Sequence, residues 1–255
     1  MVTGMASTQE DRANEAVTAH RSIAVVVGGS GAIAKALVHK WSQDPDLTVV
    51  SLSRTSSGFS KVQSVITDYS DESLASAARH VAAIGLPLSR LVICNGMLSG
   101  DAIRPERKVS DLDVAAFDTV MSVNTLLPMR VLGAFWRVIR DAEDPRIAVL
   151  SARVGSLEDN KLGGWYSYRA SKAALNMMLK CAAIEARRVN SRAKIIAYHP
   201  GTVDSALSRP FQRSVPDGKL FSPDYTAAQL IDILDSVVAD GDLSYLDWAG
   251  QPIPW

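Results

Sequence analysis

Short apolar runs alternate with segments of helical spacing along most of this chain. Residues 23–27 form a β-branched, fully apolar run that stops at Gly28-Gly29-Ser30-Gly31, and a segment of helical periodicity covers 32–41. Continuous apolar runs predict buried strands, and apolar residues three and four apart predict helices. A strand, a glycine turn and a helix in this order are typical of a doubly wound parallel sheet.

The alternation continues to the end of the chain. Further strands are predicted at 47–52, 62–66, 91–94, 147–150, 194–198 and 244–248, and helices at 70–84, 111–140, 167–188 and 224–239, with a kink at Pro128. We therefore expect an α/β fold of one domain, residues 21–255, with a doubly wound parallel sheet flanked by helices. Residues 1–20 are expected to be a flexible N-terminal segment, and 203–220 a mobile excursion.

The composition narrows the classes of partner. The chain has 255 residues, with 27 basic and 27 acidic side chains. A net charge of zero gives no long-range attraction to nucleic acid or to anionic membranes. Two cysteines, Cys94 and Cys181, are too few for a disulfide framework. The first twenty residues lack the apolar core of a signal peptide, and no apolar run reaches the roughly 20 residues that a membrane span needs. We expect a cytoplasmic protein with no nucleic-acid or membrane partner, and the scattered histidines predict no metal site.

Tyr168 and Lys172 are the first candidates for chemistry. They are four residues apart in a predicted helix, so that they share one face of it. A cation about 4 Å from a phenol interacts with it by roughly 4 kcal/mol at an effective dielectric near 20, which is about three pK units. The pair is thus a candidate proton donor and acceptor near neutral pH. A tyrosine stacked on a lysine stem, with its ammonium in water, is the alternative.

Four strand ends carry candidate ligand-binding residues, because ligands bind at the carboxyl ends of parallel strands. The glycine turn and the helix after it suit a pyrophosphate. Ser53-Arg54 lacks an acid for ribose hydroxyls, and Arg54 suits a 2′-phosphate unless it is only a surface charge. Asp68 is expected either to accept from an adenine amino group or to cap the following helix. Asn95-Gly96 forms a small turn against which a cofactor can lie flat.

With these motifs in this order, the chain resembles the classical short-chain dehydrogenase/reductase family, which has a Rossmann-type fold. Within the family, it looks most like the C-factor and sniffer-type carbonyl reductase branch. The resemblance extends over residues 22–250 and rests on Gly28–Ala34, Asn95-Gly96, Asn124, 151–156, Tyr168-Arg-Ala-Ser-Lys172, Gly163-Gly164-Trp165-Tyr166 and His199-Pro-Gly-Thr-Val-Asp204.

The resemblance implies an oxidoreductase that transfers a hydride between NADP(H), rather than NAD, and a small carbonyl or alcohol. Tyr168 would be the proton donor or acceptor, Lys172 would lower the pKa of Tyr168, and Asn124 would hold a water that resupplies protons. The cofactor would be bound by Gly28, Ser30, Gly31, Ala32, Ile33, Ser53, Arg54, Asp68, Asn95, Gly96, Tyr168, Lys172, Pro200, Gly201, Thr202 and Val203.

The chain departs from the family pattern at several positions. Ala32 and Ala34 replace two cofactor glycines, which is expected to weaken pyrophosphate binding. The family serine position is Ala152, so that the hydroxyl beside Tyr168 is expected from Ser156 rather than from Ser151, which an extended strand would turn away. Without either serine, turnover falls, because one lost oxyanion donor costs about 10²- to 10³-fold in rate.

Two other functions remain open. A cofactor-binding sensor or signalling protein on the same fold would tolerate Ala152, although binding alone needs no proton donor. An epimerase acting on a nucleotide sugar uses the same Tyr and Lys, but the short region after Thr202 leaves little room for a sugar-nucleotide domain. We expect Gly163, Trp165, Ser205 and Phe211 to line a pocket for a modest apolar compound. Helices 111–140 and 167–188 are apolar on more than one side, and predict a homodimer or homotetramer.

Overall fold

The structure is a computed structural model that describes residues 21–100 and 103–255. The expected flexible segment 1–20 lies outside the described residues. Seven parallel strands form one sheet in the order β3-β2-β1-β4-β5-β6-β9, as predicted for a doubly wound fold. They are β1 (Ser22–Val27), β2 (Leu47–Ser53), β3 (Gln63–Ile66), β4 (Leu88–Ile93), β5 (Arg146–Leu150), β6 (Lys194–His199) and β9 (Leu243–Asp247).

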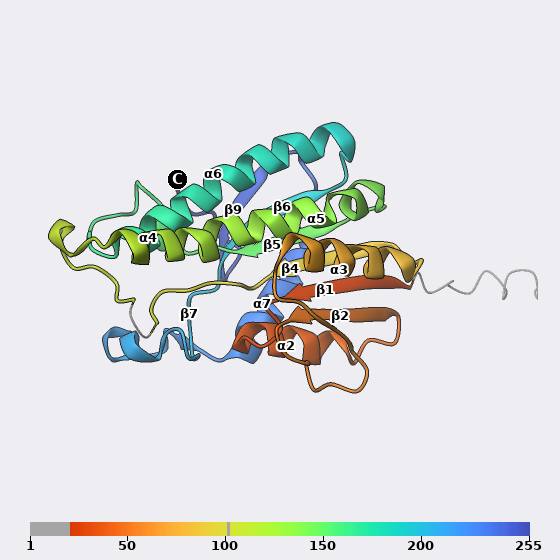
Figure 1. Ribbon diagram of the computed structural model, residues 1–255, viewed down its shortest axis with the longest axis horizontal. Coiled ribbons are helices and arrows are strands. Elements are labelled where there is room, and N and C mark those ends of the chain that lie inside the picture. Colours follow the sequence, from red (N-terminus) through yellow and green to blue (C-terminus); the bar gives the residue numbers. More distant parts are fainter. Residues whose placement is uncertain (1–20, 101–102) are drawn as a thin grey trace, which may run out of the picture.

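Helices cover both faces of this sheet (Figure 1). One face carries α2 (Ala32–Trp41) and α7 (Pro223–Ser236), and the other carries α3 (Asp71–Ala83), α5 (Leu127–Asp141) and α6 (Tyr166–Val189). The predicted helices therefore form within a few residues of their expected bounds. Ser70, which was expected at the start of a helix, caps α3 by accepting a hydrogen bond from the Ser73 N–H at 3.2 Å.

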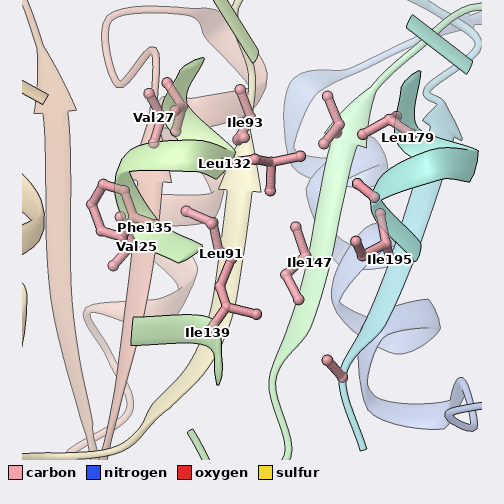
Figure 2. Packing of buried hydrophobic residues seen from close by; sticks show 14 of the residues in the cluster. Val25, Val27, Leu91, Ile93, Leu132, Phe135, Ile139, Ile147, Leu179 and Ile195 are labelled. Carbon is pink, nitrogen blue, oxygen red and sulfur yellow. The ribbon is translucent and has the colours of Figure 1, made fainter. Parts of the chain in front are cut away.

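The two helical layers bury two apolar cores. Figure 2 shows Phe135 and Leu132 of α5 over the strand residues Val25, Leu91 and Ile93. Leu179 of α6 packs in the same core, and Phe135 and Leu179 are both 0% exposed. Full burial of such a side chain contributes about 1.5–3 kcal/mol, so this packing anchors α6 on the sheet.

The predicted helix over 111–140 forms, but it contains an irregular turn that lies before Pro128. The structure has α4 (Val114–Met121), a π-helical turn η2 (Ser122–Leu126) and then α5. Pro128 lies in the first turn of α5, where its missing N–H is tolerated. The irregular turn is the π-helical segment directly before α5.

The predicted excursion 203–220 contains regular structure. Strands β7 (Thr202–Val203) and β8 (Leu220–Phe221) pair in parallel as a separate small ribbon. Between these two strands lies a 3-10 helix, η4 (Arg209–Ser214). Figure 1 shows this excursion at the end of the sheet that also receives the start of α2. Among the described residues, no helix combines the length and the apolar character that crossing a membrane requires.

Candidate active site

A cleft of about 940 Å³ lies at the carboxyl ends of the strands. It is lined by the start of α2, the segments after β4, β5 and β6, the first turns of α6 and the 203–220 excursion. The predicted site residues that line it are Ser30, Gly31, Ala32, Ile33, Asn95, Gly96, Tyr168, Lys172, Pro200, Gly201, Thr202 and Val203. Of the expected substrate-pocket residues, Trp165, Ser205 and Phe211 line the cleft and Gly163 does not.

The glycine turn positions one end of the cleft. Gly28 has a φ of 84°, which favours glycine, and its N–H donates to the Leu52 carbonyl at 2.9 Å. A Cβ on Gly29 would lie 2.1 Å from the Ser51 hydroxyl oxygen, so that a larger residue would require this hydroxyl to rotate away. Gly31 is the N-cap of α2 and supplies no side-chain hydrogen bond. The first N–H groups of α2 thus remain available to an anion at the cleft.

The cleft offers cationic side chains for phosphates and an acceptor for a hydrogen-bond donor, which together fit a ligand such as NADP(H). The Asn95 Oδ1 is buried and has no hydrogen-bond partner among the described residues. The charged side chains in the lining are Lys35, Lys172 and Lys219, with no acidic residue in the described part of the lining. Ala32, which replaces a family glycine, also lines this end of the cleft. The donor set therefore favours an anionic ligand over a cationic one.

Tyr168 and Lys172 both face the cleft from α6. The Lys172 side chain is buried, and its Nζ lies 6.0 Å from the centre of the Tyr168 ring. The same Nζ donates a hydrogen bond of 2.7 Å to the Leu150 carbonyl at the end of β5. Two elements thus fix the ammonium beside the phenol, and the predicted sharing of one helix face is confirmed.

The expected lowering of the Tyr168 pKa is wrong for the protein without ligands. Burial, assisted by the neighbouring Tyr245, raises the pKa of the Tyr168 phenol to about 12. Burial also lowers the pKa of the Lys172 ammonium to about 7. Desolvation opposes the charged form of each group, and at 6.0 Å from the ring the ammonium does not outweigh it.

Asn124 lies beneath the cleft rather than in its lining. It is fully buried in the π-turn, where its Oδ1 accepts from the Met97 N–H at 2.7 Å and its Nδ2 donates to the Met97 carbonyl at 2.8 Å. Its Nδ2 also lies 3.0 Å from the Ser171 hydroxyl, beside Lys172 on α6. Asn124 therefore joins the segment after β4 to the helix that carries Tyr168.

The two candidate serines have other contacts. The Ser151 hydroxyl donates to Asn176 Oδ1 at 2.7 Å, and Ser151 lines the cleft. The Ser156 hydroxyl accepts from the Asp159 N–H at 3.0 Å, and Ser156 is not part of the lining. Ala152 does line the cleft. Ser156 thus lies outside the lining that contains Tyr168, and its expected role at the phenol stays a prediction.

The remaining predicted cofactor residues lie outside the cleft lining. Arg54 is exposed directly after β2, and the Ser53 hydroxyl donates to the Thr55 carbonyl. Asp68 Oδ1 accepts from the Ser70 N–H at 2.8 Å and from the Ser73 hydroxyl at 2.7 Å, which lowers the pKa of Asp68 to about 2. The contacts of Asp68 are therefore those of its alternative role at the start of α3.

Trp165 and Phe211 form an aromatic wall that lines the cleft beside Tyr168. The Trp165 ring meets the Tyr168 ring edge-on, with centroids 6.2 Å apart, and the Phe211 ring of η4 at 5.2 Å. Trp165 has a φ of 52°, a left-handed conformation that is uncommon for a bulky residue. Such a wall suits the apolar part of a ligand next to the phenol.

Two polar residues near Tyr168 had no predicted role. One lines the cleft and the other contacts the start of α6. His199 lines the cleft with its Nδ1 buried and unpaired within the described residues, and burial lowers its pKa to about 4. Glu106 is buried, and its carboxylate accepts from the N–H of Ser167 in the first turn of α6. Among three neighbouring basic residues, nothing in the sequence distinguishes Glu106 from a surface charge. In residues 21–100 and 103–255, no group of His, Cys, Asp and Glu is arranged to hold a metal ion.

Comparison with known proteins identifies the family. The short chain dehydrogenase family matches residues 22–215. The chain therefore belongs to the short chain dehydrogenase family, a family of oxidoreductases, as the sequence motifs predicted. C-signal of Myxococcus xanthus is 30% identical over 147 residues, which are 58% of this chain and 83% of that protein.

Other relatives have a named activity or a solved structure. The 1-hydroxy-2-glutathionyl-2-methyl-3-butene dehydrogenase of Rhodococcus sp. (strain AD45) is 28% identical over 188 residues, or 70% of this chain and 76% of that protein. Carbonyl reductase Sniffer of D. melanogaster has a TM-score of 0.78 at 16% identity, covering 92% of this chain and 99% of that one. An NADPH-bound carbonyl reductase from chicken fatty liver has a TM-score of 0.76 at 21% identity, with the same coverage. The solved structures share the fold.

Proposed function

We propose that this protein transfers a hydride between NADP(H) and a small carbonyl or alcohol substrate. The observation that carries the proposal is that Tyr168 and Lys172 stand together in a cleft whose other end is the open N-terminus of α2. A proton donor and an anion-binding helix end in one cleft are what a nicotinamide-dependent reduction requires. The NADPH-bound carbonyl reductase of the same fold and the dehydrogenase from Rhodococcus support this class of reaction.

The chain offers contacts along the whole length of a dinucleotide. The N–H groups at the start of α2 would hold the pyrophosphate, and the buried Asn95 Oδ1 would accept from a donor of the ligand. Thr202 and the neighbouring backbone would bind the carboxamide at the other end of the cleft. Arg54, exposed after β2, would pair with a 2′-phosphate and favour NADP over NAD. When bound, the cofactor supplies or accepts the hydride.

Tyr168 would handle the proton. With a pKa raised to about 12, its phenol is protonated at neutral pH, and donation to a carbonyl oxygen would need the resulting phenolate to be stabilised. A positive charge on Lys172 would stabilise that phenolate, since its Nζ lies 6.0 Å from the centre of the Tyr168 ring. Asn124 would hold the segment after β4 and the part of α6 near Lys172 in fixed positions. The family resemblance also implies that Asn124 holds a water that resupplies protons.

A sensor or signalling protein is the second candidate, and one observation favours it. Ala152 presents a methyl group to the cleft, while the Ser151 hydroxyl is engaged by Asn176. Of the two candidate serines, only Ser151 lines the cleft, and its hydroxyl already has a partner. Such a site would bind the dinucleotide but reduce carbonyls slowly or not at all.

Absorbance at the NADPH band, followed with a panel of aldehydes and ketones, separates the two candidates. We expect consumption of NADPH by the wild type and at least about 100-fold less by Tyr168→Phe, with nearly unchanged NADPH affinity. Tight NADPH binding without consumption would favour the sensor. An unchanged rate in Tyr168→Phe would remove this residue from the mechanism.

We also propose that the protein associates with itself through α6. Met177 is 65% exposed on that helix, and Cys181 is exposed one turn further along the same face. A long helix with an unpartnered apolar stripe is suited to pack against its copy in a two-fold dimer. Sedimentation at micromolar protein should give a dimer or tetramer, and Met177→Glu should shift it toward the monomer.

A further inference from the structure

Glu106 makes a set of contacts that the proposed reaction does not yet use. The residue lies in the segment after β4, far from α6 in sequence, and its side chain is only 6% exposed. Its Oε2 accepts from the Ser167 N–H at 3.2 Å, and its Oε1 accepts from the Ser167 hydroxyl. Its backbone carbonyl also accepts from the Trp165 N–H at 2.6 Å.

These contacts replace the cap that α6 lacks. The N-cap residue of α6 is Trp165, which makes no side-chain hydrogen bond to the helix. The first N–H groups of a helix need acceptors, and a carboxylate there also complements the helix dipole. Glu106 thus caps α6 from a different part of the chain, one turn before Lys172 and beside Tyr168.

The same contacts hold a backbone of uncommon conformation. Gly163, Gly164 and Trp165 have φ values of 63°, 65° and 52°, three left-handed residues in succession. A Cβ on Gly164 would lie 3.3 Å from the Glu106 carbonyl oxygen, so that the two segments approach closely. For Trp165 this conformation is unfavourable and persists because surrounding contacts fix it.

The consequence reaches the reacting groups through Trp165. Its ring is in edge-on contact with Tyr168 at 6.2 Å and with Phe211 at 5.2 Å. We propose that Glu106 is a positioning residue that fixes the Trp165–Tyr168 turn, and thereby sets where a carbonyl substrate meets the phenol. The proposal rests on the proposed function and adds to it a residue that touches neither substrate nor cofactor.

Replacement of Glu106 in the full-length chain tests this role. Glu106→Ala should lower kcat by about tenfold or more and raise the KM for the carbonyl, because small misplacements of reacting groups are costly. The NADPH dissociation constant, measured by fluorescence, should change by less than about twofold, since Glu106 does not line the cofactor end. Glu106→Gln should stay close to the wild type, because its amide can accept from the Ser167 N–H and donate to the hydroxyl.

Asp113 provides a matched control. Its side chain caps α4 by accepting from the Ala116 N–H at 2.8 Å, and it is not part of the cleft lining. Asp113→Ala removes a comparable helix cap and should leave kcat and KM unchanged. If Glu106→Ala does not fold by circular dichroism, Ser167→Ala, which removes only the hydroxyl contact, should show the same changes at a smaller scale.

Amide hydrogen exchange, read by mass spectrometry, locates the effect without turnover. Glu106→Ala should speed exchange in peptides covering 164–172, whereas Glu106→Gln and Asp113→Ala should not. The proposal is overturned if kcat and exchange in Glu106→Ala match those of Asp113→Ala, or if Glu106→Gln behaves like Glu106→Ala. A wild type that consumes no NADPH would contradict the proposed function instead, and the exchange difference would still decide whether Glu106 holds the turn.

Discussion

The ammonium nitrogen of Lys172 lies 6.0 Å from the centre of the Tyr168 ring, and it donates to the Leu150 carbonyl at 2.7 Å. Burial moves the two pKa values apart, to about 7 for Lys172 and about 12 for Tyr168. Two neighbouring groups with separated pKa values are suited to different roles in proton transfer. Here the phenol keeps its proton at neutral pH, while the lysine changes charge close to it.

The buried lysine predicts a pH dependence of stability. The folded pKa of Lys172 is about 7 and the unfolded value about 10.5, so that between these values the unfolded chain binds more protons. The free energy of unfolding therefore rises with pH across this window and is flat below it, as far as this group is concerned. In Lys172→Met this rise should be absent. Urea unfolding at pH 6, 8 and 9.5 should show a wild-type-minus-variant difference that grows by several kcal/mol.

A constant difference over that pH range would contradict the low pKa of Lys172. Because the comparison is made between two chains that differ at one residue, titrations elsewhere cancel. Far-UV circular dichroism of Lys172→Met checks that the native fold is retained at each pH.

We predict that replacing Ala152 by serine increases activity. Ala152→Ser adds a hydroxyl to the cleft lining, where the family resemblance places one, and a single oxyanion donor is worth about 10²- to 10³-fold in rate. We expect kcat for carbonyl reduction to rise by at least about tenfold. Ser156→Ala is the matched control and should leave kcat unchanged, because that hydroxyl contacts the Asp159 N–H away from the cleft. A fall in kcat in Ser156→Ala would restore Ser156 to the mechanism.

Most of the fold could be predicted because its signals are local. Strands β1 and β5 are mostly short apolar runs, and β1 is followed by Gly28, whose φ of 84° favours the glycine that the sequence supplies. The π-helical turn between α4 and α5 could not be located in this way. Asn124, which lies in that turn, bonds to Met97, 27 residues away in the chain, whereas Pro128 was the only local signal for an irregular helix.

The candidate site divides along the same line. Tyr168 and Lys172 share a helix face because of their spacing, which the sequence shows directly. The choice of Ser156 failed to find support because a strand pattern does not show where the chain turns after Leu150. Glu106 was missed because it is 61 residues from Ser167 in sequence, and only the fold brings the two together.

We predict that Arg54 makes the protein bind NADPH more tightly than NADH. Its guanidinium is exposed at the end of β2, where the family resemblance places the adenosine ribose. A charge-assisted hydrogen bond contributes about 1.5–3 kcal/mol, so that Arg54→Ala should raise the NADPH dissociation constant by about 10- to 100-fold. The NADH dissociation constant should change little, because NADH carries no 2′-phosphate. Equal weakening of both cofactors, measured by fluorescence titration, would assign Arg54 a general electrostatic role instead.

We predict that Phe211, as part of the aromatic wall, strengthens the binding of apolar substrates. Its ring lies 5.2 Å from Trp165 on the cleft lining, and removing such a half-buried aromatic contact costs about 1–3 kcal/mol. Phe211→Ala should therefore raise the KM for an apolar ketone by about tenfold or more, with NADPH affinity unchanged. Phe211→Leu keeps apolar bulk against Trp165 and should retain most of the affinity. If steady-state kinetics gave wild-type KM values for both variants, the substrate would have to bind away from this wall, on the side of the cleft formed by the segment after β4.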